Sequence, residues 1–123
     1  MTWTDLANEE PAIALGPLDG RYRPAVAPLV NYLSEAALNR ARVHGEVEWL
    51  IHLAATGAVP GVPALTDAEI AFLRDIPATF GSAEIAEMAA TEAVTQHDVK
   101  AVEYFIKARM ERAAETLGET GAK

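Results

Sequence analysis

The chain has 123 residues, with 10 Lys and Arg against 18 Asp and Glu, and it contains no cysteine. This length fits one domain, and the formal charge of −8 argues against a general nucleic-acid binder, which needs a basic face for the phosphates. Without cysteine there can be no disulfide, thiolate metal site or cysteine nucleophile. The lack of thiols fits a reducing compartment.

Half of the residues are hydrophobic, and alanine is the most frequent of them. Because alanine favours helices but removes little apolar surface from water, we expect helices around a thin core that packs against something else. No apolar run approaches the roughly 18–20 residues of a membrane span, and the acidic N-terminus does not resemble a signal peptide. We therefore expect an all-α, cytoplasmic chain with no significant sheet and no membrane partner.

Residues 1–23 form the first expected segment, which is irregular because proline and glycine interrupt it too often for a helix. The helical domain is expected over residues 24–118. Pro24 suits the first position of its opening helix, and Pro28 limits that helix because its ring clashes with an interior turn. Residues 119–123 are expected to form a frayed tail.

A long helix is predicted from about Ser34, a good N-cap, to about Thr56, with Gly57 as its stop. Its apolar positions repeat at helical spacing and predict one buried stripe made of Val43, Val47, Leu50 and Ala54. Gly45 lies inside this helix, where a glycine costs about 1 kcal/mol relative to alanine. We therefore expect a close backbone neighbour at Gly45.

Residues 57–65 are predicted to form a loop. Thr66 and Glu69 have the spacing of a capping box, which opens a helix that ends near Phe80. Pro77 is expected to kink or shorten the last turn of this helix.

Two further helices complete the prediction. The first begins after Ser82 and runs towards Val94. Thr95 and Asp98 are a second candidate for a capping box, and Gly118 is expected to end the helix behind them. That last helix has the clearest apolar stripe in the chain, formed by Val99, Val102, Ile106, Met110, Ala113 and Leu117.

The early loop from Asp19 to Tyr22 is the first candidate for chemistry. Arg21 offers a charged fork and Tyr22 a phenol beside a flexible glycine, which is a combination that suits an anionic ligand. The alternative is a plain turn, in which Arg21 pairs with a surface acid and Tyr22 packs on a helix.

The second candidate is the start of the last helix, with Gln96, His97, Asp98 and Lys100. A helix N-terminus presents unpaired N–H groups and the positive end of a dipole, and both suit phosphate or carboxylate. His97 and Lys100 would add a titratable donor and a fixed cation. The alternative is ordinary capping by Asp98 or Thr95, with His97 merely exposed.

His44, Glu48 and His52 are spaced four residues apart, so they share one face of the long helix. Such a row could hold zinc, but a solvated face is far commoner, and we predict no metal site. The sequence also lacks a P-loop, a dinucleotide-binding glycine motif and a nucleophile elbow.

Three stretches of the sequence resemble adenylosuccinate lyases, which belong to the fumarase/aspartase superfamily. They are residues 18–22 (LDGRY), 42–50 (RVHGEVEWL) and 95–107 (TQHDVKAVEYFIK). The third is close to the family signature T-x-H-D-V-K-A-V-E-Y-F, although Gln96 stands where the family usually has Asn or His. The resemblance extends over about residues 13–109 and implies the N-terminal helical domain of a longer enzyme.

The resemblance implies a β-elimination that releases fumarate from adenylosuccinate and from the succinyl-carboxamide intermediate of purine synthesis, without a cofactor. It also implies homotetramers in which each site gathers residues from three subunits. The general-acid histidine and the serine loop with the general base are expected beyond Lys123. We therefore expect this chain to be inactive alone.

The resemblance assigns substrate binding to residues of both candidate segments. Arg21 and Tyr22 would hold the nucleotide end, whereas His97 and Asp98, with Gln96, would contact the substrate, and His97 would stabilise its negative charge. Lys100 would belong to the same pocket. The full substrate-binding set that the resemblance implies is Arg21, Tyr22, Gln96, His97, Asp98 and Lys100. Two alternatives stay open: a non-catalytic helical module that self-associates through exposed apolar faces, and an unrelated helical ligand binder.

Overall fold

The structure is a computed structural model, which describes residues 3, 5–7 and 12–121. In chain order its elements are α1 (Arg23–Val26), the 3-10 helix η1 (Ala27–Leu29), α2 (Val30–Leu33), α3 (Glu35–Thr56), α4 (Asp67–Ala78), α5 (Ser82–Thr95) and α6 (Asp98–Gly121). No strand occurs within these described ranges, and the all-α prediction is confirmed. None of the described helices combines the length and the apolarity that crossing a membrane requires.

The chain forms two compact units, Met1–Ser34 and Glu35–Lys123. The domain limits expected at 1–23, 24–118 and 119–123 stay a prediction. The predicted end of the last helix at Gly118 is wrong, because α6 continues to Gly121. A glycine ends a helix only where it adopts a left-handed conformation, and otherwise it costs only about 1 kcal/mol within the helix.

In the first unit, short helical turns follow one another. Pro24 lies in the first turn of α1, at its second position rather than the predicted first because the helix begins at Arg23, and α1 ends at Val26. Pro28 lies in the 3-10 helix η1 that follows, so the expected limit on the first helix is confirmed. Ser34 has an extended backbone after α2, and its hydroxyl donates to the carbonyl of Val30 at 2.6 Å.

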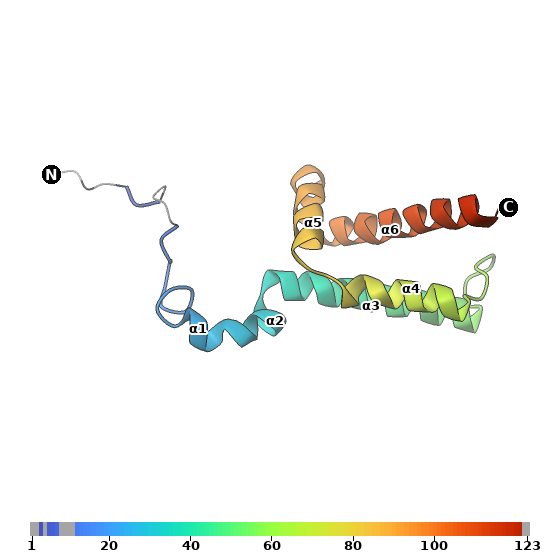
Figure 1. Cartoon of the computed structure of the whole chain (residues 1–123), viewed down its shortest axis with the longest axis horizontal. Helices are drawn as coiled ribbons and strands as arrows, with labels where there is room; N and C mark the ends of the chain where they lie inside the picture. The colour runs from blue at the N-terminus through green and yellow to red at the C-terminus, as the bar shows by residue number, and fades with distance from the viewer. Residues whose placement is uncertain (1–2, 4, 8–11, 122–123) are drawn as a thin grey trace. The chain divides into compact units, whose positions relative to one another are not determined.

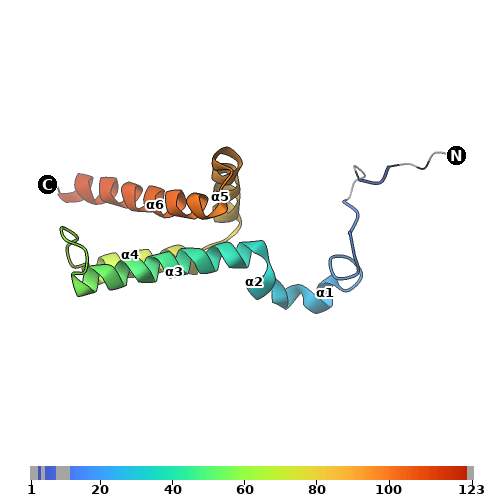
Figure 2. The same cartoon turned by 180° about the vertical axis from the view of Figure 1, so that it is seen from behind.

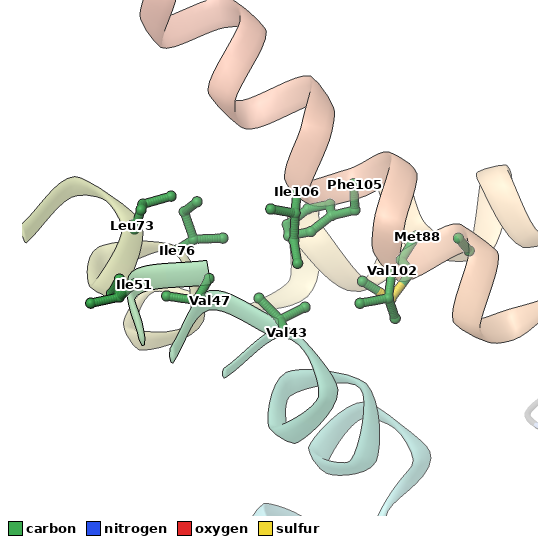
Figure 3. Close-up of a cluster of buried hydrophobic side chains, with 10 residues drawn as sticks. Val43, Val47, Ile51, Leu73, Ile76, Met88, Val102, Phe105 and Ile106 are labelled. Carbon is green, nitrogen blue, oxygen red and sulfur yellow. The ribbon is translucent and has the colours of Figure 1, made fainter. Parts of the chain in front are cut away.

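In the second unit, α3 and α4 run side by side, and α5 lies across the beginning of α6 (Figures 1 and 2). α6 also contacts α3, and this contact brings the start of α6 to the N-terminal half of α3. The four helices enclose one cluster of buried side chains (Figure 3), which consists of Val43, Val47, Ile51, Leu73, Ile76, Met88, Ala101, Val102, Phe105 and Ile106.

The predicted apolar stripes are confirmed in their centres and differ at their edges. On α3, Val43, Val47 and Ala54 are buried, but Ile51 is buried where Leu50 was expected, and Leu50 packs partly against the core. On α6, Val102 and Ile106 are buried, whereas Val99 is 48% and Met110 40% exposed. The spacing identified the correct faces, but burial also depends on which turns the neighbouring helices cover.

The ends of the middle helices are close to those predicted. Gly57 follows α3 with φ +65°, the left-handed conformation that suits a C-terminal glycine. At the start of α4, the Thr66 hydroxyl accepts from the Glu69 N–H at 3.2 Å, and Glu69 accepts from the Thr66 N–H at 2.8 Å. This is the predicted capping box. With Pro77 in its last turn, α4 ends at Ala78, two residues before the predicted end.

The structure contradicts the prediction of a close backbone neighbour at Gly45. Gly45 is exposed on α3, and a Cβ atom added there would meet no atom of the described residues within 4 Å. The described part of the second unit therefore supplies no close neighbour that would explain a glycine at this position.

Candidate functional site

The early loop is a folded turn held by Asp19. One carboxylate oxygen of Asp19 accepts from the N–H of Gly16 at 2.7 Å, and the other accepts from the N–H of Leu15 at 3.0 Å. The bonds from Gly16 and then Leu15 hold the pKa of Asp19 below its ordinary value, because they favour the charged form. A Cβ atom on Gly20 would lie 2.8 Å from the Ala14 Cβ, so close packing explains this glycine.

Arg21 and Tyr22 follow this turn with exposed side chains. The Tyr22 N–H donates to the Pro17 carbonyl at 2.8 Å, which fixes the backbone at the end of the loop. The Arg21 guanidinium lies over the Tyr22 ring, 5.5 Å from its centroid. The structure therefore brings these two predicted binding residues together within the first unit.

The other predicted residues lie in the second unit, where Gln96 joins α5 to α6. Gln96 has φ 53° and ψ 30°, a left-handed conformation in which its N–H donates to the Glu92 carbonyl at 2.8 Å. Its side-chain amide donates to the Ala93 carbonyl at 2.8 Å. The amide group is thus bound to the last turn of α5, where it caps an otherwise unpaired carbonyl.

His97 caps α6 directly. Its Nδ1 accepts from the N–H of Lys100 at 3.2 Å, and its carbonyl accepts from the N–H of Ala101. The predicted capping box of Thr95 and Asp98 is wrong, because the Thr95 hydroxyl instead contacts the N–H and the carbonyl of His97, at 3.3 and 3.1 Å. The bond from Lys100 needs a lone pair on Nδ1, so the ring proton of a neutral His97 resides on Nε2.

Asp98 is held on both carboxylate oxygens. Oδ1 accepts from the Val99 N–H at 2.8 Å, and Oδ2 accepts from Arg42 Nη1, also at 2.8 Å. The hydrogen bond from Val99 and then that from Arg42 hold the pKa of Asp98 below its ordinary value. Asp98 is therefore charged near neutral pH, with a cation from α3 beside it.

Lys100 is engaged by the next turn of its own helix. Its Nζ lies 3.0 and 2.8 Å from the two carboxylate oxygens of Glu103 and 5.2 Å from the centroid of the Tyr104 ring. The bond to Glu103 raises the pKa of Lys100 and keeps it charged. Two cations near the start of α6, Lys100 and Arg42, are therefore paired with carboxylates.

These contacts change what the start of α6 can offer an anion. From the sequence, the N–H groups at the start of this helix were expected to be free for a ligand. In the structure, the N–H groups of Val99 and Lys100 donate to the Asp98 and His97 side chains. The His97 side chain itself is 63% exposed. Its Nε2–H group is thus a donor that this segment can present to negative charge.

In the row of His44, Glu48 and His52 on α3, the side chains of Glu48 and His52 contact residues outside the row. Glu48 binds Arg74 of α4, and the ring of His52 stacks on that of Trp49 at 5.7 Å between centroids. In the part of the chain that the structure describes, no three His, Cys, Asp or Glu side chains are grouped as metal ligands.

Arg42 is the residue that the sequence analysis missed. It lies in the stretch RVHGEVEWL, but no spacing rule relates it to Asp98, which is 56 positions away in the sequence. Its Nη1 also donates to Asn39 Oδ1, one turn earlier on α3, at 3.3 Å. Only the packing of α3 on α6 reveals this pair.

The sequence is similar to several curated lyases. The adenylosuccinate lyase of Haemophilus influenzae (strain ATCC 51907 / DSM 11121 / KW20 / Rd) is 45% identical over 104 residues, which are 85% of this chain and 23% of that protein. That of Escherichia coli (strain K12) is 43% identical over 79% of this chain and 21% of its own length. That of Legionella pneumophila (strain Corby) is 42% identical over 76% of this chain and 21% of its own length. No family model matches the chain.

By sequence relationship, this all-α chain is thus related to lyases. More particularly, the chain is homologous to a segment of adenylosuccinate lyases. It spans about one fifth of the length of the curated relatives it matches.

Proposed function

We propose that this chain supplies substrate-binding groups to an adenylosuccinate lyase. The enzyme would release fumarate by β-elimination from adenylosuccinate and from the succinyl-carboxamide purine intermediate. The observation that carries this proposal is the 45% identity over 85% of the chain. We assign the general-acid histidine and the serine loop to the part of the relatives that this chain does not match, and propose a homotetramer in which three subunits complete each site.

His97 has the central role in this proposal. In a β-elimination, a base removes a proton next to a carboxylate, and negative charge develops on that carboxylate. A donor that is already oriented stabilises this charge better than water, which must reorganise. The cap on Nδ1 supports such a role, because it leaves the Nε2–H group to be donated to the substrate.

The other predicted residues complete the substrate-binding set. We assign the nucleotide end to the guanidinium fork of Arg21 and the phenol of Tyr22, which lie side by side on an exposed turn. Gln96, Asp98 and Lys100 are proposed to contact the substrate beside His97. Because the Gln96 amide, the Asp98 carboxylate and the Lys100 ammonium already have partners, their contacts would add to existing bonds.

The experiment is a chimera in which this chain replaces the matched segment of the Haemophilus influenzae adenylosuccinate lyase. We expect the assembled chimera to release fumarate from adenylosuccinate, as measured by the change in ultraviolet absorbance. This chain alone and the truncated relative alone are each expected to be inactive.

Two results would contradict the proposal. One is a chimera that assembles to the same size as the parent enzyme but has no activity. The other is turnover by the 123-residue chain alone, which would contradict the assignment of the acid and base to other segments. The matched control is the same chimera with Arg23→Met, which removes an exposed arginine outside the proposed set.

A second function, a non-catalytic module that self-associates, is favoured by one observation. An apolar groove of about 620 Å³ lies between α3 and α6, and its lining includes Trp49, Leu53 and Met110. Trp49 is 56% exposed. Light scattering should then give a dimer or larger species that Trp49→Glu disrupts, and a monomer at all concentrations would exclude this function.

A further inference from the structure

Arg42 and Asp98 connect α3 to the first residue of α6. The distance between Arg42 Nη1 and Asp98 Oδ2 is 2.8 Å, and the two side chains are 30% and 46% exposed. A partly exposed ion pair of this kind usually contributes little to stability. Asp98, however, directly follows His97 in the sequence, so the pair can affect the His97 ring.

The Nδ1 atom of His97 lies between two competing partners. It is 3.2 Å from the backbone nitrogen of Lys100, whose N–H group can only donate a hydrogen bond. It is also 3.9 Å from Asp98 Oδ1, which belongs to a charged carboxylate and can only accept one. In the first contact Nδ1 must be unprotonated, and in the second it must carry a proton. The shorter contact is within hydrogen-bond distance and the longer one is not, so the cap determines the state of the ring.

We propose that Arg42 is a positioning residue for His97: by holding the Asp98 carboxylate, it keeps the imidazole in the tautomer that caps α6 and carries its proton on Nε2. Arg42 neutralises the carboxylate and directs one of its oxygens towards α3. The carboxylate is then a weak competitor for a proton on Nδ1.

Removal of Arg42 reverses this preference. The Asp98 carboxylate would lose its cation and become a stronger acceptor beside Nδ1. The imidazole could then donate an Nδ1–H bond to Asp98, and it would lose the bond from the Lys100 N–H. Its Nε2 would become an acceptor, which repels the anionic group that the Nε2–H group attracts.

The functional meaning of this tautomer rests on the proposed function, but its measurement does not. Long-range ¹H–¹⁵N NMR spectra of the 123-residue chain distinguish the two ring nitrogens of His97 and report which one carries the proton. The spectra are recorded at about pH 8.5, roughly two units above the pKa of an unperturbed histidine. Failure of the chimera to turn over substrate would leave this result unaffected.

We expect the Nε2–H tautomer in the unmodified chain and a shift towards the Nδ1–H tautomer in Arg42→Met. The tautomer ratio should change about fivefold, which corresponds to one net hydrogen bond of about 1 kcal/mol. Arg42→Lys should restore the original ratio in part. The double variant Arg42→Met/Asp98→Asn should return to the Nε2–H tautomer, because the competing carboxylate is gone.

The matched control is Arg74→Met, which removes the arginine of another ion pair with α3 and should leave the His97 ring unchanged. An Arg42→Met chain that stays folded and keeps the original tautomer ratio overturns the proposal. If Arg42→Met does not fold, Arg42→Gln provides the same measurement. Loss of folding in both variants would also overturn it, because Arg42 would then maintain the fold rather than orient His97.

Discussion

Glu48 and Arg74 form a two-point ion pair between α3 and α4. Arg74 Nε lies 2.7 Å from Glu48 Oε1, and Arg74 Nη2 lies 3.0 Å from Glu48 Oε2. This parallel arrangement matches the planar guanidinium to the planar carboxylate. It uses the carboxylate at the centre of the row His44, Glu48 and His52 to join two helices.

The pair predicts how stability depends on pH. The hydrogen bond from Arg74 holds the pKa of Glu48 below its ordinary value. A depressed carboxyl pKa contributes stability above the unfolded pKa, and this contribution is lost as the pH falls through the folded pKa. Glu48→Gln should therefore lower the Tm at pH 7, and the difference from the unmodified chain should shrink as the pH falls below about 4, where carboxyl groups titrate.

Circular dichroism melts at a series of pH values provide the measurement. Glu46→Gln is the control, because it removes an exposed charge from the same helix, and Glu46 forms no ion pair among the described residues. A Tm difference between Glu48→Gln and the unmodified chain that is constant from neutral to acidic pH would show that the ion pair does not contribute.

Gly45 and Gly57 predict opposite effects of the same substitution. Gly45 is an exposed helical residue with open space at its Cβ position, so Gly45→Ala should raise the free energy of unfolding by about 0.5–1 kcal/mol. Gly57 has φ +65°, so Gly57→Ala should lower it by roughly 1–2 kcal/mol. Urea unfolding measures both, and a destabilised Gly45→Ala chain would indicate a neighbour at that position.

Replacing Gln96 with alanine and with glycine should give two variants of different stability. Gln96→Ala and Gln96→Gly both remove the hydrogen bond to the Ala93 carbonyl. Only glycine also relieves the left-handed conformation at φ 53°. The glycine variant should therefore be more stable than the alanine variant by roughly 1 kcal/mol in urea unfolding. Equal stabilities would mean that the backbone changes conformation when the side chain is removed.

The sequence predicted the helices well because their signals are local. Apolar spacing, the capping box at Thr66 and the glycine after α3 each depend on neighbours within a few residues. The errors arose where another helix, or the conformation that a single glycine adopts, decides the outcome. Whether Leu50 or Ile51 is buried depends on where α4 lies, and the continuation of α6 past Gly118 depends on the backbone conformation that the glycine adopts.

The start of α6 was predicted in its location but not in its contacts. The residue types there suggested an anion site, with the amide N–H groups as donors. Instead, His97 uses Nδ1 as the cap, and Asp98 reaches across to Arg42. The 56-residue separation of that pair means that no periodic pattern could reveal it. The relation of Arg21 to His97 stays a prediction.

Two substitutions of His97 should separate its role as the cap of α6 from its proposed role in substrate binding. His97→Ala should lose the cap and lower the free energy of unfolding by about 0.5–2 kcal/mol. His97→Asn should keep a cap, because asparagine is a preferred N-cap residue, but lose the Nε2–H donor. In the chimera, turnover by His97→Asn should fall by about 10²-fold or more, the usual effect of removing one donor to developing charge.

Steady-state kinetics and urea unfolding of both His97 variants separate the two effects. A His97→Asn chimera with normal turnover would exclude the proposed stabilisation of charge. Low turnover of His97→Ala alone would instead indicate that only the cap is needed.

Replacing Arg21 should weaken substrate binding and have little effect on the chemical step. If its guanidinium contacts the phosphate or a carboxylate, Arg21→Met should remove a charged hydrogen bond of about 1.5–3 kcal/mol, which corresponds to roughly a 10- to 150-fold rise in KM. The value of kcat should change much less, because a contact far from the reacting bond is equal in the ground state and the transition state. Arg21→Lys should recover part of the affinity, since a lysine keeps the charge but lacks the planar fork. An unchanged KM in Arg21→Met, beside an unchanged KM in the Arg23→Met control, would remove Arg21 from the binding set.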